Sequence, residues 1–527
     1  MNILDRFKAI TGLAINRNKS EVIALGYYKA HPPDICPSGL AFSTGPFKIL
    51  GITFTTTLNN LFELNFLPKK EKLVNILKIW AMRYLTPIGK IVILKSLALS
   101  QLIFLLSVLP SPPQQFIKTI EDIVYSFIWD NKPDKISRQT IIGDYSQGGL
   151  KMFHFPSIIS GLKIAWVKRY LNDQNKGKWK CFFDYHLEKF GGNMIWTCNM
   201  NAKDFLLDSI QNTFIYDIAK EWFKFTYTTD IKNSRSQCIW LNSHIKIDNK
   251  IIFYKNWYSK GVKKVKDLLN GDVFLNFENF RLKYDIKCNF LEYYSLLHAI
   301  PPEWKKQIKD NEVDNTYQLS PQEQTMLSLQ RTTKVCKYIH TKNVQRIFQQ
   351  PRAEQKWTEI LNENLDWGNI YMLPFNSTLN QRLRYFQFRI SHRIIGVNKL
   401  LFSMGLSQTD TCSLCSGARE TISHLFWDCQ ITNKFILEIQ NTLFNNTFTI
   451  TKPIFLFGSN EEKIKYFNHV FIYAKYFIFS IKEKCQFLSL SSFRAMLQQI
   501  KHIEGNMSEK AKRQINFYSK WEFFERS

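Results

Sequence analysis

Residues 411–429 read TCSLCSGARETISHLFWDC and bring three cysteines and one histidine together in the spacing C-x2-C-x8-H-x4-C. Two cysteines separated by two residues, Cys412 and Cys415, can bind one metal ion from a tight turn. His424 and Cys429 would return from a following short helix and complete a tetrahedron. This donor set predicts a zinc site. Because the protein fills all four positions, the zinc would be structural rather than catalytic.

The step of five residues from His424 to Cys429 requires an irregular helix, because residues five apart do not share a helical face. We therefore expect the helix to end or bend between these donors, and Gly417 to shape the turn after the cysteine pair. His392 could compete as a ligand, although a buried, hydrogen-bonded histidine is the more common case. Chance is the alternative, but with ten cysteines in the chain a C-x2-C pair followed by a suitable His and Cys arises in roughly one chain in a thousand.

The sequence around this segment is mostly helical from residue 377 to the end. A last long helix is predicted over residues 463–482, where apolar side chains recur at near-helical spacing. Such a stripe is more often part of a core than a binding face. We therefore expect residues 377–527 to form a helical, zinc-stapled C-terminal domain.

Residues 56–170 also have a helical pattern, with a break at residues 86–89 and a second helix predicted from about 90 to 108. A third helix follows the next prolines, and three helices joined by short turns would form a bundle. Residues 1–55 are mixed, with a helical start that breaks at Gly12 and short β-branched segments after it. The predicted fold class is therefore mainly α with a small α+β N-terminal piece.

Residues 171–376 form a mixed connecting region in which we see no catalytic constellation, and residues 303–324 are polar enough to be a linker. The longest uncharged apolar stretch covers residues 96–110. It is shorter than the roughly 18 to 20 residues that a membrane span needs. We predict a buried helix there and no membrane partner.

The chain is strongly basic, because 70 Lys and Arg against 44 Asp and Glu give a formal net charge of +26. A field of this size attracts a polyanion and makes nucleic acid the leading partner. A solvated basic surface and a membrane surface are the alternatives. The ten cysteines are scattered apart from one cluster, and no cleavable apolar leader opens the chain. We therefore expect an intracellular protein, cytoplasmic or nuclear, and not a secreted one.

Several blocks, in order along the chain, resemble the region after the active site of LINE-type non-long-terminal-repeat retrotransposon reverse transcriptases. Residues 7–21, FKAITGLAINRNKSE, resemble the family's palm segment F-x3-[ST]-G-L-x-[IL]-N-x2-K-S. Residues 47–52, FKILGI, resemble its Y-L-G-I primer grip, and residues 389–393, RISHR, precede the Cys-Cys-His-Cys site as they do in the family. Shorter similarities to its thumb and connecting region lie at Trp80, Ile88-Gly89-Lys90, Phe127-Ile128-Trp129, Gly148-Gly149-Leu150, Trp257, Gly261, Leu268 and Tyr284.

This resemblance implies a residual palm segment over residues 1–55, a thumb-like bundle over 56–170, a connecting region over 171–376 and the zinc-bearing domain over 377–527. In the family the zinc-binding region engages RNA and target DNA, so both are expected partners, while the oligomeric state is left open. The residues expected to contact nucleic acid are Lys48, Gly51, Lys90, Lys95, Arg384, Arg389 and Arg393. For the last two, a pair of solvated helix charges is the alternative.

A polymerase needs carboxylates that hold two metal ions, and this sequence contains no Asp-Asp pair. The nearest acidic pair, Glu121-Asp122, is predicted to lie on the solvated face of a helix. We therefore expect a truncated, non-enzymatic fragment of a LINE-type reverse transcriptase that binds nucleic acid and zinc. Two alternatives are kept: an incomplete record of an active RNA-directed DNA polymerase, and a zinc-stapled protein-interaction module.

Overall fold

The computed structural model describes residues 2–14, 16–31, 42–43, 45–56, 58–205, 210–310, 328–329, 331–484, 486–510 and 520–521. The chain forms two compact units. Unit 1 comprises Met1–Ile76, Ala98–Glu121 and Phe155–Asn343, and unit 2 comprises Leu77–Leu97, Asp122–His154 and Val344–Ser527. The described part is mainly helical, as predicted, and its named strands form three two-stranded antiparallel hairpins. The predicted domain boundaries at residues 55, 170 and 376 stay predictions.

The N-terminal residues contain the predicted short helix and a hairpin. Helix α1 (Asn2–Thr11) ends where Gly12 takes a φ of +73°, which confirms the predicted break. Strands β1 (Phe47–Ile49) and β2 (Ile52–Phe54) are joined by Leu50 and Gly51, whose φ values are +49° and +83°. Positive φ at both central residues is the mark of a two-residue hairpin turn that matches the twist of the strands. Other short elements here are η1 (Arg17–Lys19) and α2 (Tyr27–Ala30).

The next helices are α3 (Leu61–Ala81), α4 (Pro87–Ile93), α5 (Ser100–Val108) and α6 (Gln114–Ile128). The predicted break lies at the start of α4, where the Thr86 hydroxyl accepts a hydrogen bond from the Gly89 amide at 3.4 Å. The single helix predicted from 90 to 108 is instead α4, the π-helical turn η3 (Leu94–Ala98) and α5.

The apolar stretch over residues 96–110 is buried on one side, through Ala98, Leu99, Leu102, Leu105, Leu106 and Leu109, while Leu97 and Phe104 are exposed, so the predicted burial is confirmed only in part. Among the described helices, none alone has the length and hydropathy of a membrane span. The segments Pro87–Ala98 and Ser100–Val108 meet those criteria only together, and they are bent by 46°.

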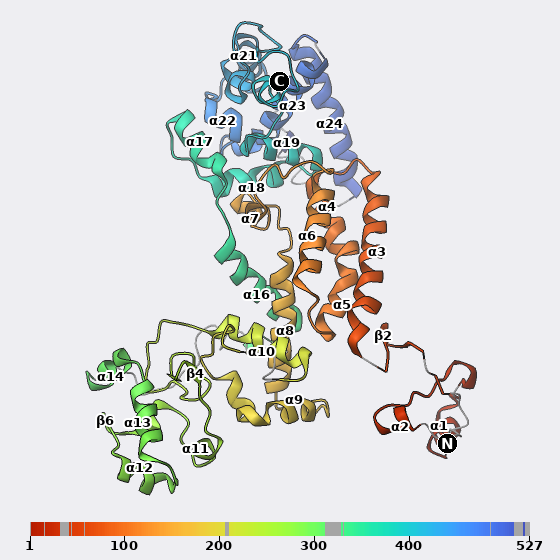
Figure 1. Cartoon of the computed structure of the whole chain (residues 1–527). Helices are drawn as coiled ribbons and strands as arrows, with labels where there is room; N and C mark the ends of the chain where they lie inside the picture. Colours follow the sequence, from red (N-terminus) through yellow and green to blue (C-terminus); the bar gives the residue numbers. More distant parts are fainter. Residues whose placement is uncertain are drawn as a thin grey trace. The chain divides into compact units, whose positions relative to one another are not determined.

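Unit 1 is built around α8 (Phe155–Leu171) and α10 (Thr213–Thr226), which pack on each other (Figure 1). Helix α10 begins where the Asn212 side chain accepts hydrogen bonds from the Phe214 and Ile215 amides. Its apolar face is buried in an aromatic-rich core that includes Trp222. The region predicted as mixed contains α9 (Lys180–Leu187), η5 (Glu188–Phe190), η6 (Gly192–Trp196), β3 (Lys246–Ile247), β4 (Lys250–Ile251), α11 (Lys255–Ser259), η8 (Val265–Leu268), β5 (Leu269–Asn270), β6 (Val273–Phe274), α12 (Phe277–Tyr284), α13 (Phe290–Ala299), α14 (Pro302–Lys309) and α16 (Thr332–Ile347).

In unit 2, helix α23 (Asn468–Lys484) is buried along most of its length and contributes many residues to the core. The predicted last helix, over residues 463–482, corresponds to α23, but a further long helix, α24 (Leu490–Lys510), follows it. The prediction that this was the last long helix is therefore wrong. The other elements are α7 (Arg138–Ile141), η4 (Tyr145–Gln147), α17 (Arg352–Leu361), α18 (Trp367–Ser377), α19 (Gln381–Ser391), α20 (Asn398–Ser403), η9 (His424–Asp428), α21 (Gln430–Leu443), α22 (Lys452–Phe457) and η10 (Lys465–Phe467).

The predicted linker over residues 303–324 is helical in its first part, where α14 reaches Lys309. Residues 311–324 lie outside the described part of the chain.

Candidate metal centre and nucleic-acid interface

Cys412, Cys415, His424 and Cys429 lie together in unit 2, with their four donor atoms all within 4.8 Å of one another. The Cys415 Sγ and His424 Nε2 atoms are 3.3 Å apart. A tetrahedral zinc ion with sulfur at about 2.3 Å and nitrogen at about 2.0 Å separates such a pair by roughly 3.5 Å. The three thiols and one imidazole therefore fit zinc, which would bind them as thiolates and a neutral ring.

Residues 410–420 form a tight hairpin that we call the knuckle. Thr411 and Arg419 form an antiparallel bridge, and the Cys412 amide donates to the Ala418 carbonyl at 2.7 Å. The left-handed residue of the turn is Ser416, with φ +53°, and not Gly417. Gly417 takes part in the turn through its amide, which donates a hydrogen bond to the Cys415 thiol.

The other two donors are placed by the π-helical turn η9. The Cys429 amide donates to the His424 carbonyl at 2.9 Å, a bond between residues five apart. In a regular α-helix two residues five apart differ in direction by about 140°, whereas the wider π turn brings both onto one side. The predicted bend between His424 and Cys429 is thus confirmed. Cys429 then occupies the N-cap position of α21, without a hydrogen bond from its side chain to the helix.

Glu420 fixes the knuckle from inside the unit, and sequence reasoning missed it. Its carboxylate is fully buried and accepts hydrogen bonds from the Ser413 amide at 3.0 Å and the Asn398 amide at 2.8 Å. It also forms an ion pair with Lys482 of α23. Ser413 lies between the first two cysteines, so this carboxylate ties the metal-binding turn to α20 and α23. The sequence does not reveal that Glu420 has a buried structural role, because its partners come from other segments of the chain.

The thiols differ in acidity. Burial raises the pKa of Cys412 to about 12. For Cys415, hydrogen bonds from the Gly417 amide and from His424 outweigh the effect of burial and lower the pKa to about 7. A bound zinc ion deprotonates its thiol ligands outright.

Residues 352–435 match the family model described as zinc-binding in reverse transcriptase. The matched segment contains all four donors, the knuckle and helix α19. Together with the donor geometry, this match shows that zinc is the cofactor of the region. It also shows that the chain is related to reverse transcriptases in this segment.

The predicted arginines lie on α19 or directly after it. Arg384 donates to the Thr378 carbonyl at 2.6 Å and the Phe375 carbonyl at 3.1 Å, so part of its guanidinium is engaged in structure. Arg393, with φ +58°, lies 4.7 Å from the centre of the Trp357 ring. Within the described residues, Arg393 forms neither a hydrogen bond nor an ion pair through its side chain. Its charge is therefore not compensated there.

Arg389 lies among three aromatic rings, with its guanidinium 5.6 to 5.7 Å from the ring centres of Tyr385, Phe386 and Phe479. Its Nε atom is buried and has no hydrogen-bond partner in the described structure. Burial lowers the pKa of Arg389, and Glu483 opposes this effect without forming an ion pair. Such a guanidinium can donate hydrogen bonds to a phosphate or stack on a base.

Lys135 belongs to the same neighbourhood and was not predicted. Its ammonium lies 5.9 Å from the centre of the Trp129 ring. Partial burial lowers the pKa of Lys135, and the charges of Arg389, Lys132 and Lys90 lower it further, while Asp130 opposes them. The end of α6 and helix α19 therefore bring several cations together in unit 2. No local sequence signal could reveal this, because the residues are more than 250 positions apart.

Lys90 and Lys95 occupy different environments. Lys90 is only 2% exposed and its ammonium contacts the Ile128 carbonyl and Asp130. A buried ammonium paired in this way is not available to a phosphate, so we assign Lys90 a structural role and leave it out of the interface. Lys95 is half-buried, 4.8 Å from the centre of the Phe153 ring. Burial lowers the pKa of Lys95 and Lys151 adds to this effect.

The predicted primer-grip residues lie in unit 1, on the β1–β2 hairpin. Lys48 is exposed and pairs across the hairpin with Thr53. Gly51 occupies the turn with a positive φ, and a Cβ atom added there would meet no atom within 4 Å. The turn thus needs glycine for its backbone conformation and leaves the tip open to a partner.

His392 is a buried core residue and not a member of the metal cluster, in line with the more common case named above. Its Nε2 atom lies 2.9 Å from the Gly148 carbonyl, and its ring stacks on Tyr371 at 5.4 Å. Burial lowers the pKa of His392 to about 4.

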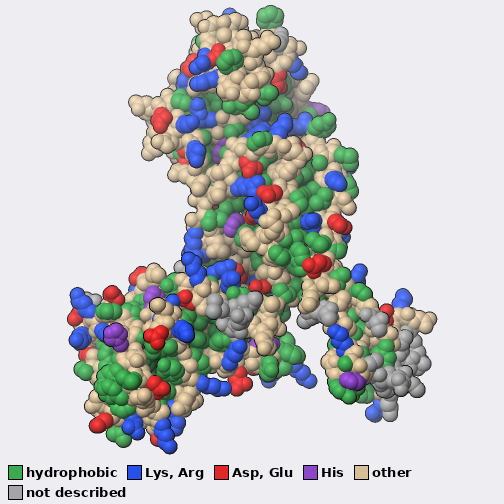
Figure 2. Space-filling view, in the orientation of Figure 1, with side chains coloured by type: hydrophobic (Ala, Val, Ile, Leu, Met, Phe, Trp, Pro, Cys, Tyr) green, Lys and Arg blue, Asp and Glu red, His purple; other side chains and the backbone are tan. Residues whose placement is uncertain are grey.

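Figure 2 shows Lys and Arg side chains at many places on the face in view, with fewer Asp and Glu among them. This distribution agrees with the formal charge of +26. On this face the positive charge is therefore spread widely, and the local groups of cations described above decide where an anion would be bound.

Proposed function

We propose that this chain corresponds to the part of a LINE-type non-long-terminal-repeat reverse transcriptase that follows the polymerase carboxylates, and that it binds RNA and DNA without catalysing nucleotide addition itself. The motifs in residues 7–21 and 47–52 support the LINE type. The match over residues 352–435 supports the relation to reverse transcriptases. The absence of an Asp-Asp pair from the sequence supports a non-enzymatic role for this chain.

The observation that carries the binding proposal is the state of Arg389 and Arg393. Both lie in the matched zinc-binding segment, both pack against aromatic rings, and neither forms an ion pair in the described residues. Arginines in proteins are otherwise commonly paired with carboxylates, and a guanidinium on an aromatic face binds phosphate or stacks on a base. The zinc-bearing knuckle would hold α19 in place while these arginines, with Lys135, contact the nucleic-acid backbone.

Thiolate ligands also bear on where the protein acts. Zinc binding by Cys412, Cys415 and Cys429 requires reduced cysteines. This requirement supports the proposal that the protein acts in the cytosol or nucleus, where thiols stay reduced and where RNA and DNA are found.

The test measures binding of the full chain to fluorescent RNA and DNA of equal length over a range of ionic strength. We expect the double variant Arg389→Gln/Arg393→Gln to bind both more weakly and to lower the magnitude of the salt slope by about 1.4 for single strands and about 1.8 for duplex. The matched control is Arg346→Gln/Arg352→Gln, which removes two exposed arginines of unit 2 and the same charge.

Equal loss in both double variants would show that only net charge matters and would contradict the proposed interface. If the chain instead bound a protein partner saturably, and neither salt nor added nucleic acid changed that binding, the zinc-stapled interaction module would be favoured. Incorporation of deoxynucleotides into a primed RNA template by the purified chain would overturn the non-enzymatic role.

A further inference from the structure

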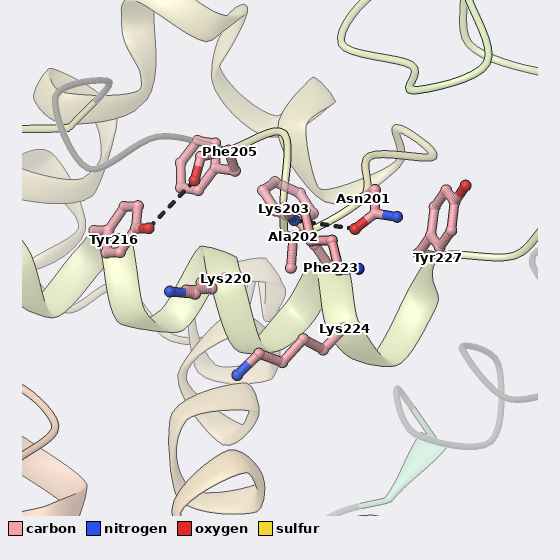
Figure 3. A pocket seen from close by; sticks show the side chains of 9 residues that line it. All are labelled: Asn201, Ala202, Lys203, Phe205, Tyr216, Lys220, Phe223, Lys224 and Tyr227. Atoms are coloured by element: carbon pink, nitrogen blue, oxygen red, sulfur yellow. Dashed lines mark hydrogen bonds between the residues drawn. The ribbon is translucent and has the colours of Figure 1, made fainter. Parts of the chain in front are cut away.

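Unit 1 contains a hollow of about 520 Å³ beside helix α10 (Figure 3). One side of it is a single face of α10, where Tyr216, Lys220 and Phe223 follow one another at intervals of four and three residues, and it continues to Tyr227 directly after the helix. The other side is the segment of residues 201–205. A hollow of this volume is within the range of sites that take ligands of nucleotide size.

Aromatic side chains stand at both ends of the hollow (Figure 3). At one end Phe205 stacks on Tyr216 with ring centres 5.2 Å apart and planes inclined by 11°, and the Tyr216 hydroxyl donates to the Phe205 carbonyl at 3.2 Å. At the other end Tyr227 stacks on His244 with ring centres 5.7 Å apart. These contacts fix the orientation of the rings, so a planar ligand could pack against aromatic side chains that are already in position.

The lining is positively charged and contains no carboxylate among the described residues. Three lysines line the hollow, of which Lys224 is neutralised by an ion pair with Glu221. Lys220 lies 5.4 Å from the centre of the Tyr216 ring and forms no ion pair in the described structure. The acid beside Lys203 in the sequence, Asp204, is itself paired with Lys246. Lys203 and Lys220 therefore line the hollow without an ion pair among the described residues.

We propose that this hollow binds one nucleotide of a single-stranded nucleic acid, with the base against the aromatic walls and the flanking phosphates near Lys203 and Lys220. The two lysines come from opposite sides, one from the 201–205 segment and one from α10. This separation suits phosphates on either side of a base better than the single phosphate end of a free nucleotide. A duplex is excluded, because its bases are stacked on one another and cannot enter.

The inference rests on the proposed function, in that the chain meets nucleic acid, but it adds a second contact in unit 1 and restricts its ligand to single strands. The site uses no residue of the zinc region. Its failure can therefore be separated from failure of the interface on α19.

The experiment compares full-chain variants by fluorescence anisotropy with a labelled 12-nucleotide RNA, with the same sequence as a duplex, and with nucleoside monophosphate as competitor. We expect Lys203→Ala/Lys220→Ala to weaken single-strand binding roughly tenfold at low salt and to reduce the salt slope by about 1.4, with little effect on the duplex. The control Lys250→Ala/Lys287→Ala removes two exposed lysines of the same unit. Circular dichroism checks that each variant is folded.

Photocrosslinking of RNA that contains 4-thiouridine provides a second readout that does not depend on a mutation. We expect crosslinks within residues 201–227, and Tyr227→Ala should reduce them while Tyr227→Phe retains them. Displacement of RNA by a nucleoside monophosphate at micromolar concentration would show a free-nucleotide site and overturn the strand proposal. The inference would be overturned if the Lys203→Ala/Lys220→Ala variant and its control bound single strands with equal affinity. If Arg389→Gln/Arg393→Gln were still impaired in the same experiment, the proposed function would remain supported.

Discussion

Glu420 and Lys482 form an ion pair inside unit 2, where the two side chains are 0% and 7% exposed. The carboxylate also accepts the Ser413 amide of the knuckle, so the pair connects the metal-binding turn with helix α23. Removing one partner of a buried pair leaves a buried charge without compensation, which typically costs about 3 to 5 kcal/mol.

We therefore predict that Glu420→Gln lowers the free energy of unfolding by about 3 kcal/mol and weakens zinc binding. The double variant Glu420→Gln/Lys482→Met should lose less than the sum of the single variants, because both charges are then absent. Chemical denaturation measures the first quantity and competition with a zinc chelator the second. Glu462→Gln is the control, since its pair with Lys465 is on the surface and exposed pairs contribute little to stability.

Zinc content gives the next prediction. The purified chain should contain about one zinc ion, and Cys412→Ser should lose it, because three remaining donors do not close the tetrahedron. We expect the melting temperature of the Cys412→Ser variant to fall by about 10 °C, and we expect the same fall for the wild-type chain after treatment with a chelator. Elemental analysis and thermal unfolding measure both. Cys181→Ser should keep its zinc, since Cys181 is an exposed cysteine outside the cluster; zinc loss in this control would point to another ligand set.

The buried His392 predicts sensitivity to acid. Its pKa is lowered to about 4 in the folded chain by burial, against about 6.5 when unfolded. The unfolded chain therefore binds a proton that the folded chain does not, and stability falls as the pH drops from about 6.5 to about 4. The loss attributable to this residue is about 3 kcal/mol. The difference between wild type and His392→Gln in denaturation at several pH values isolates it; the exposed His502→Gln should show no such difference.

The turn of the β1–β2 hairpin predicts a stabilising substitution. Leu50 has a φ of +49° and is 87% exposed, so its side chain adds strain without burial. Leu50→Asn should stabilise the hairpin by about 1 kcal/mol, because asparagine adopts this conformation readily before glycine. Slower amide hydrogen exchange in residues 47–54 would show it. Gly51→Ala should have the opposite effect, and equal exchange in both variants would contradict this view of the turn.

Substitution of Lys90 and of Lys95 should distinguish a role in stability from a role in nucleic-acid binding. Lys90→Met removes the hydrogen bond to the Ile128 carbonyl and should reduce stability by about 1 to 2 kcal/mol, with no change in the salt slope of nucleic-acid binding. Lys95→Met tests the predicted contact of a half-buried lysine. A smaller salt slope of nucleic-acid binding in the Lys90→Met variant would show that Lys90 does contact the nucleic acid.

The zinc donors could be predicted from the sequence because Cys412, Cys415, His424 and Cys429 lie within 18 residues and their spacing restricts the chemistry. The mainly helical fold followed from apolar periodicity, and the bend before Cys429 followed from the five-residue step. Glu420, Lys135 and the burial of Lys90 could not be predicted in the same way. Their roles depend on partners that folding brings from distant parts of the chain, and residue type alone does not distinguish a buried lysine from a surface one.

The π-helical turn between His424 and Cys429 also restricts which insertions and deletions the region can tolerate. Adding one residue to this turn would move Cys429 further around the helix and away from His424, whereas deleting one would leave the two donors four residues apart, a spacing that an ordinary α-helix already places on one face. Substitutions within the turn keep the count and preserve the site. In related sequences the step between these two donors should therefore be five residues where the turn is π-helical and four where the helix is regular, while the composition of the turn drifts.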